Sequence, residues 1–236
     1  MSNATSEPVA LPGLPWPVEL RTHPRARRLR LALDEPRGLI RLTVPRRFSR
    51  SAALDWARRQ SAWVESQLAR IEPGEPLVAG ATIPFDGGIL LLCWDESAPR
   101  SPRLAEAILT CGGPSDRFHD RIARWLRAEA RQRLVEETRA LAARHEIADA
   151  PVSVGDAGTR WGSCSVSGAI RYNWRLILAP PDVRAYVVAH EVAHRVHMNH
   201  GPGFHALQAR LYDADVGVAR QALRLLGPRL KRVGRG

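Results

Sequence analysis

The chain has 236 residues, 44% of them hydrophobic, and a formal net charge of +11 at pH 7. This length and composition suit one large domain or two small ones with a buried core, and they exclude a largely disordered chain. No apolar run reaches the ~18 residues that cross a bilayer, which excludes a protein with membrane-spanning helices.

The N-terminal segment is rich in proline and lacks a basic stretch followed by a long apolar one. It therefore does not resemble a secretory signal, and we expect a flexible tail over residues 1–20. The odd number of cysteines, with no such signal, favours reduced thiols and a cytoplasmic location. These cysteines are Cys93, Cys111 and Cys164.

The segment after this tail favours β-structure. Residues 28–34 and 39–45 alternate apolar and polar side chains around the turn signal EPRG, which predicts a β-hairpin. Residues 49–70 place apolar side chains at helical spacing behind Ser49 or Ser51 as N-cap.

A second β region is expected at 82–94, with a turn at Asp86-Gly87-Gly88, and a shorter strand at 104–111. We therefore expect a β-rich N-terminal subdomain over 21–112 that contains one helix.

Arginine dominates the charge of the chain, since Lys231 is its only lysine. Such a balance favours an acidic partner such as nucleic acid, although a solvated basic surface is the simpler explanation. An arginine-rich run on or near the first strand is a candidate phosphate-contacting patch or the capped edge of a sheet. Its members are Arg21, Arg25, Arg27, Arg28 and Arg30.

The composition changes after residue 112. An apolar stripe with charges elsewhere predicts a long helix over 115–145, and two strands are expected at 151–156 and 169–179. Pro180-Pro181 ends the second strand, and Asp182 can start a helix that is apolar nearly all round and therefore buried.

Two further helices, at about 203–212 and 216–226, complete the chain. We expect a second domain over 113–236.

The helix that begins near Asp182 carries the segment HEVAH. His190 and His194 are four residues apart, so both rings lie on one face of the helix at a spacing that lets them share one metal ion. Glu191 can point into such a site without binding the metal and accept a proton from the attacking water. The alternative is a pair of buried histidines with ordinary hydrogen-bond partners.

A third metal ligand has several candidates. His197 lies about 10 Å along the helix axis from His190, so three ligands in line would form a poor tetrahedron. His200 is better placed because the helix breakers Asn199, Gly201 and Pro202 let the chain turn back over the metal. His205, Asp213 and Asp215 remain alternatives. His197 would then orient a ligand or cap the helix end.

Four motifs in order resemble the YgjP-like metallopeptidase family, which is related to the SprT-like zinc peptidases. They are TRWGSCS at 159–165, NWRLILAPP at 173–181, YVVAHEVAH at 186–194 and HMNH at 197–200. Together with the order of the expected elements, the resemblance covers roughly residues 21–225.

The resemblance implies an α+β protein with a zincin-like catalytic domain and an N-terminal β-rich subdomain. It implies Zn²⁺ on His190, His194 and His200, with Glu191 as general base. The family usually has Phe-Trp where this chain has Phe204-His205, which makes His205 a candidate that supports a ligand or contacts the substrate.

The WGSC segment supplies further candidates. Arg160 and Arg175 can stabilise a developing oxyanion or hold an anionic substrate, with ion pairs as the simpler alternative. Cys164 is expected to be a small buried thiol and not a fourth ligand. An extended substrate can pair with an exposed edge of the strands at 152–164 and 168–178.

The resulting prediction is a zinc metallopeptidase with a polypeptide substrate. Two alternatives keep the metal: a nucleoside triphosphate pyrophosphohydrolase, and a nucleic-acid-associated zinc protein that acts on DNA-bound proteins. The absence of a glycine-rich phosphate loop weighs against the first alternative.

Overall fold

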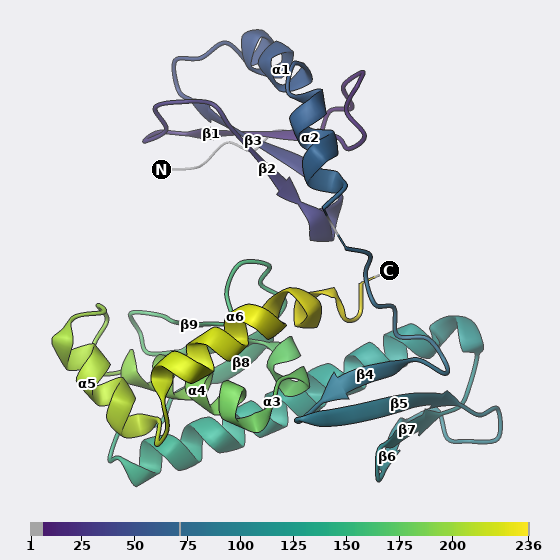
Figure 1. Ribbon diagram of the computed structural model, residues 1–236, viewed down its shortest axis with the longest axis vertical. Coiled ribbons are helices and arrows are strands. Elements are labelled where there is room, and N and C mark those ends of the chain that lie inside the picture. The colour runs from purple at the N-terminus through teal and green to yellow at the C-terminus, as the bar shows by residue number, and fades with distance from the viewer. Residues whose placement is uncertain (1–6, 71, 236) are drawn as a thin grey trace. The chain divides into compact units, whose positions relative to one another are not determined.

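The computed structural model describes residues 7–70 and 72–235, and these form two compact units, Met1–Pro73 (unit 1) and Gly74–Gly236 (unit 2). The described part contains three small sheets and six α-helices, so the α+β expectation is confirmed (Figure 1). None of the described helices is long and apolar enough to cross a membrane.

Unit 1 is a three-stranded sheet with helices packed on it. The strands β1 (Val18–His23), β2 (Arg30–Asp34) and β3 (Leu39–Pro45) take the order β1-β3-β2, in which β2 and β3 are the predicted antiparallel pair. The 3₁₀ turn η1 (Glu35–Arg37) joins them.

The helices of unit 1 differ from the single helix expected over 49–70. Ser49 is the N-cap of α1 (Arg50–Arg58), as predicted, but the last turn of α1 tightens and the amide of Gln60 donates to the carbonyl of Ala57. A second helix, α2 (Ser61–Leu68), then begins. Ala53, Ala57 and Val64 of these helices share a small core with the strands.

The expected tail over 1–20 also differs. From residue 7 the chain belongs to the fold of unit 1, because Val9 forms a bridge to Val18 and Leu11, Leu14 and Trp16 pack against its core. Burial of these apolar side chains explains why the segment is ordered despite its prolines. Residues 1–6 lie outside the described part.

Unit 2 begins with a four-stranded sheet of order β4-β5-β7-β6. The strands β4 (Thr82–Phe85) and β5 (Gly88–Trp94) form the expected hairpin. The single strand expected at 104–111 is a second hairpin, β6 (Arg103–Ala105) and β7 (Ile108–Cys111), because Glu106 adopts a left-handed conformation (φ 52°) that turns the chain.

This sheet shares the large core of unit 2 with the long helix that follows, so the compact units divide at 73–74. The expected boundary at 112–113 instead falls inside unit 2. Ile83, Leu92 and Leu109 of the sheet belong to the same buried cluster as Ile122 and Leu126. Removing the sheet from unit 2 would expose this cluster.

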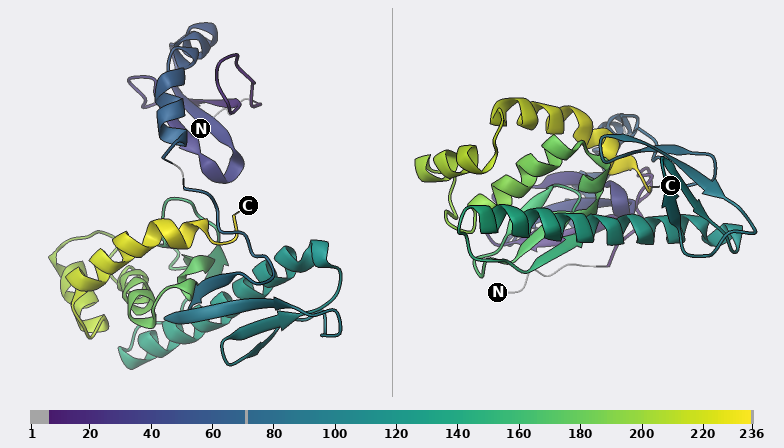
Figure 2. Two further views of the ribbon diagram at one scale, coloured as in Figure 1. Left: turned by 45° about the vertical axis from the view of Figure 1, so that its right-hand side comes forward. Right: turned by 90° about the horizontal axis from the view of Figure 1, so that it is seen from below.

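The predicted long helix is present as η2 (Ser115–Arg117) and α3 (Phe118–Arg144), which extends along unit 2 (Figure 2). Its buried side chains follow the predicted stripe. They are Phe118, Ile122, Ala123, Leu126, Ala130, Leu134, Thr138 and Ala142.

A third sheet, of order β8-β10-β9, follows α3. It is made of β8 (Val152–Gly155), β9 (Gly162–Cys164) and β10 (Ile170–Asn173). The strand expected over 169–179 ends early because the side chain of Asn173 accepts a hydrogen bond from the amide of Arg175 and turns the chain into the 3₁₀ segment η3 (Trp174–Leu178).

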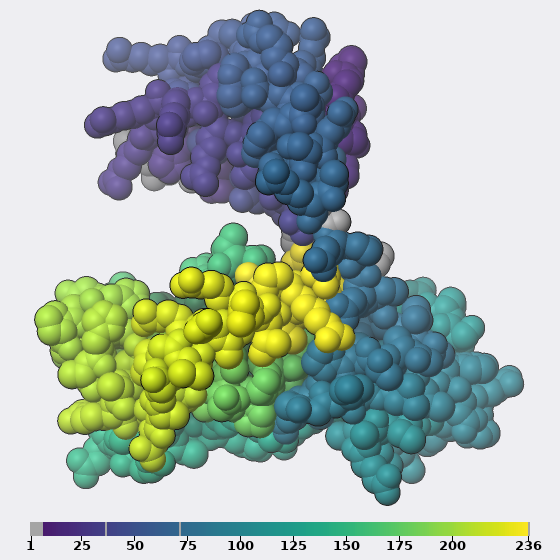
Figure 3. Space-filling model, viewed as in Figure 1, coloured from purple at the N-terminus to yellow at the C-terminus, as the bar shows by residue number. Residues whose placement is uncertain are grey.

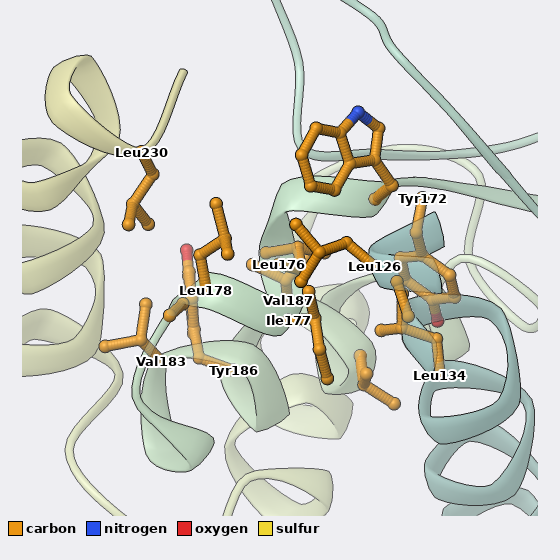
Figure 4. Close-up of a cluster of buried hydrophobic side chains, with 14 of the residues drawn as sticks. Leu126, Leu134, Tyr172, Leu176, Ile177, Leu178, Val183, Tyr186, Val187 and Leu230 are labelled. Carbon is orange, nitrogen blue, oxygen red and sulfur yellow. The ribbon is translucent and has the colours of Figure 1, made fainter. Parts of the chain in front are cut away.

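Three helices complete unit 2. They are α4 (Pro181–Ala193), α5 (Pro202–Leu211) and α6 (Val216–Arg232), and α6 lies on an outer face (Figure 3). The helix α4 is buried, as predicted, against η3, α3 and α6 (Figure 4). Burial of its Val183 and Val187 fixes the helix that carries the histidines.

Candidate metal centre

Three histidines converge at the end of α4. His190 lies on the helix, His194 is its C-cap, and His200 lies in the turn before α5. Each offers one ring nitrogen, and these atoms lie within 4.8 Å of one another. The Nε2 atoms of His190 and His200 are 3.3 Å apart. The three side chains therefore form a set that can hold a metal ion.

The chain turns back between His194 and His200, as the helix breakers predicted. The helix α4 ends at Ala193, Gly201 caps α5, and Pro202 is its first residue. His200 consequently lies over the face of α4 that carries the other two rings, with its centroid 5.2 Å from that of His190 and 4.7 Å from that of His194.

A buried aromatic ring packs against the three histidines. The ring of Phe204, on α5, is 1% exposed and lies 4.5–5.0 Å from the three imidazoles. It packs against all three and restricts their rotation. This role of Phe204 was not predicted from the sequence.

His197 contributes through its backbone. Its carbonyl oxygen lies 3.0 Å from Nδ1 of His194, so Nδ1–H can donate to it and leave Nε2 free for a metal. The ring of His197 packs instead beside Gly203, where it borders a separate hollow with His145 and Glu146. Its expected role in orienting a ligand thus falls to the main chain.

Gln208 is a further residue of the site that was not predicted from the sequence. Its side-chain amide lies 3.2 Å from Nδ1 of His190 and is buried. The amide nitrogen Nε2 is the atom of Gln208 that lies next to this Nδ1; with the amide turned over, Oε1 would accept a proton from Nδ1 and leave Nε2 of His190 for a metal. The signal for it was a glutamine at helical spacing from Phe204 and Leu211, on a face that is otherwise apolar.

Glu191 points away from solvent. It is 4% exposed, and its Oε2 has no hydrogen-bond partner among the described residues. Burial raises the pKa of this carboxyl to about 7, and the charge of Arg160 opposes the shift. A carboxyl poised near neutral pH is suited to proton transfer.

Gly162 makes room for this carboxyl. A Cβ atom at residue 162 would lie 2.4 Å from Oε1 of Glu191 and 2.6 Å from its Cγ. The absence of a side chain at Gly162 therefore allows Glu191 to approach this closely. Gly162 begins β9, which is an edge strand of its sheet.

The loop that precedes β9 is held by α6 and β10. Trp161 packs against Gly227, Lys231 donates to the carbonyl of Gly158, and Asn173 donates to the carbonyl of Ala157. Arg160, on this loop, is exposed and close enough to influence the pKa of Glu191. The charge of Arg160 thus acts on the carboxyl of Glu191.

The structure places Arg175 elsewhere. Its side chain is 1% exposed, donates to the carbonyl of Val233, pairs with Asp156 and lies over the ring of Trp174. These contacts occupy the guanidinium and leave no accessible face for a substrate. Arg175 is a buried structural residue, so its candidate role in binding substrate is corrected.

The remaining candidates, His205 and Cys164, lie outside the set of three convergent histidines. His205 is exposed, and its ring lies 6.4 Å from that of His200. Cys164 is partly buried and is not part of the convergent set found among the described residues. Burial and the neighbouring Glu191 raise the pKa of its thiol, which disfavours the thiolate that a metal would require.

Arg220, on α6, is a further cation near the site and was not predicted from the sequence. Its Nε lies 3.4 Å from the hydroxyl of Tyr186, a residue one turn before His190. The charges of Arg220 and of the neighbouring histidines add to burial, which is the largest cause, in lowering the pKa of His190 to about 4. The imidazole is therefore neutral, as a metal ligand must be.

Comparison with known proteins adds one finding to this geometry. No curated protein and no solved structure matched the chain. A family model described as the YgjP-like metallopeptidase domain matches residues 27–225, which is most of the chain and includes every residue of the histidine cluster. The chain therefore belongs to the YgjP-like metallopeptidase domain family.

Proposed function

We propose that this protein is a zinc-dependent metallopeptidase with a zincin-like catalytic domain in unit 2. The observation that carries the proposal is the convergence of three imidazole nitrogens beside one buried carboxyl group, that of Glu191, whose Oε2 has no hydrogen-bond partner among the described residues. Three neutral nitrogen ligands suit Zn²⁺ and leave a coordination position open, which is typical of catalytic sites.

The residues of the chain fit such an ion. Nδ1 of His194 faces the carbonyl of His197 and Nδ1 of His190 faces Gln208, so Nε2 of both rings is directed to the same space as His200. When bound, the metal would polarise the scissile carbonyl and make water a stronger nucleophile.

Glu191 acts as the general base in this proposal. Its carboxylate accepts a proton from the attacking water and passes it to the amine that leaves. Burial keeps the pKa of this carboxyl close to neutral pH, so the group can both accept the proton and release it. Arg160 is placed to stabilise negative charge that develops nearby, and its attraction keeps Glu191 from becoming too basic.

The edge strand β9 supplies a place for an extended polypeptide. It pairs with β10 on one side only, and it begins at Gly162, against Glu191. A substrate strand added to this edge would receive main-chain hydrogen bonds beside the proposed base. His205 and Arg160 would border such a substrate.

The proposal is tested with purified protein, stripped of metal and reconstituted with zinc. We expect release of peptides from a labelled unfolded protein, no release by the stripped protein, and restoration by zinc. The same samples are given nucleoside triphosphates. Pyrophosphate release without peptide cleavage would contradict the peptidase and favour a phosphoanhydride hydrolase that uses the same metal centre.

A further inference from the structure

Unit 1 contains a groove that the metal centre does not use. The groove has a volume of about 860 Å³ and lies between β2 with the loop before it and the helices α1 and α2. Basic and aromatic side chains line it. They are His23, Arg27, Arg28, Arg30, Trp56 and Trp63. We call it the arginine groove.

The charges of unit 1 are segregated. Met1–Pro73 holds 13 arginines against seven acidic residues, for a net charge of +6. Glu19 and Asp34 are paired with Arg37 and Arg41, outside the groove. Within the described residues, no carboxylate lines the groove itself. Its potential is therefore positive.

The arginines of the groove are available to a ligand. Arg27, Arg28 and Arg30 are exposed, and in the described part of the chain their guanidinium groups make no hydrogen bond or ion pair. Guanidinium groups match phosphate oxygens in geometry as well as in charge. Three of them on neighbouring positions can follow a short run of phosphates.

The tryptophans add a second kind of contact. Trp63 is 40% exposed although it is among the largest apolar side chains, and Trp56 is half-buried beside it in the groove. Aromatic faces next to arginines bind bases by stacking, without regard to sequence. Paired bases of a duplex are already stacked on one another and cannot use such faces.

We propose that the arginine groove binds single-stranded nucleic acid, with phosphates on Arg27, Arg28 and Arg30 and bases stacked on Trp63 and Trp56. An acidic peptide would use the arginines but gain nothing comparable from the indoles, and a free nucleotide would engage only part of the groove. This binding is independent of the metal centre.

The test measures binding of the full chain to a fluorescent 12-nucleotide oligothymidine by anisotropy, over a range of salt concentrations. The variant Arg27→Gln/Arg28→Gln/Arg30→Gln is expected to weaken binding. It should also lower the slope of log K against log salt by about 2, since each phosphate contact on a single strand contributes about 0.7.

The matched control removes the same charge elsewhere in unit 1. Arg46, Arg47 and Arg50 are exposed and lie outside the groove. The variant Arg46→Gln/Arg47→Gln/Arg50→Gln should leave the slope close to that of the unmodified protein. Equal losses in both triple variants would overturn the proposal in favour of a diffuse basic surface.

A second pair of variants tests stacking. Trp63→Leu is expected to weaken binding roughly tenfold, while Phe48→Leu, an exposed aromatic residue outside the groove, should have no effect. Circular dichroism checks that each variant is folded. Equal affinity for a duplex of the same length, or for a polyglutamate peptide, would contradict the proposal, as would undiminished binding by Trp63→Leu.

Discussion

The candidate metal centre in unit 2 and the arginine groove in unit 1 differ in how their side chains are held. At the metal centre each imidazole has an assigned neighbour: His190 faces Gln208, His194 faces a carbonyl, and Phe204 packs against all three rings. In the groove, Arg27, Arg28 and Arg30 are exposed and make no hydrogen bond or ion pair among the described residues. Side chains that are fixed by their neighbours suit a reaction at one defined position. Exposed side chains without such neighbours suit an extended and variable ligand.

The largest effect, on zinc content, is expected when two of the three histidines are removed. His190→Ala/His194→Ala leaves one of three ligands, so the purified variant should contain no zinc, compared with about one ion per chain in the unmodified protein. Metal content by mass spectrometry checks this. The groove should be unaffected, and full zinc occupancy in the variant would refute the ligand assignment.

Substitutions at His200 and His197 distinguish a residue that binds zinc through its ring from one that acts through its backbone carbonyl. His200→Ala should weaken zinc binding by more than 100-fold, because a ligand is lost. His197→Ala should leave affinity nearly unchanged, because the carbonyl that orients His194 remains. Competition with a chelator measures both. A loss at His197→Ala as large as at His200→Ala would show that the ring of His197 matters.

The sequence predicted that the three histidines meet but not what holds them in place. Spacing and helix breakers indicated that His190, His194 and His200 would meet, and the structure brings them together. Gln208 and Phe204 lie on α5, and their contacts depend on how α5 packs against α4, which no local pattern specifies. The four-strand sheet was likewise assigned to the N-terminal half, because only tertiary packing shows that Leu92 and Leu109 share a core with Leu126.

The same limit explains why the two arginine candidates, Arg160 and Arg175, have different outcomes. Arg175 was expected within a strand, but the turn made by Asn173 directs it into the core beside Asp156. Arg160 was an equally good candidate from the sequence. The loop that precedes β9 keeps it close enough to affect the pKa of Glu191. Only the position of that loop distinguishes the two.

Burial of Glu191 should appear as a pH dependence of stability in the metal-free protein. Because the pKa of the folded state is raised from 4.5 to about 7, the native protein keeps a proton that the unfolded chain releases, and stability falls as pH rises through this interval. Glu191→Gln removes this loss. Its free energy of unfolding should exceed that of the unmodified protein at pH 8 by about 3 kcal/mol, at 1.36 kcal/mol per pKa unit.

Chemical denaturation of the two proteins at pH 4.5 and pH 8 measures the effect. The difference between them should be small at pH 4.5 and level off above pH 7. A difference that does not change with pH would show that Glu191 is not desolvated as described.

A smaller effect is expected at Gln208. Gln208→Leu removes the partner of His190 Nδ1 while keeping the volume of the side chain, and should weaken zinc binding by about 10- to 100-fold. Gln208→Glu retains an acceptor and should restore most of the affinity. Equal affinities in both variants would mean that Gln208 serves only packing.

The central claim is that the cluster is catalytic and that Glu191 is its base, and Glu191→Gln tests it most directly. The amide has nearly the shape of the carboxylate but cannot accept the proton. Zinc content and peptide release are measured on the same preparation. We expect one zinc per chain and a loss of turnover of about 10²–10⁴-fold. Turnover at the unmodified rate with zinc in place would contradict the claim.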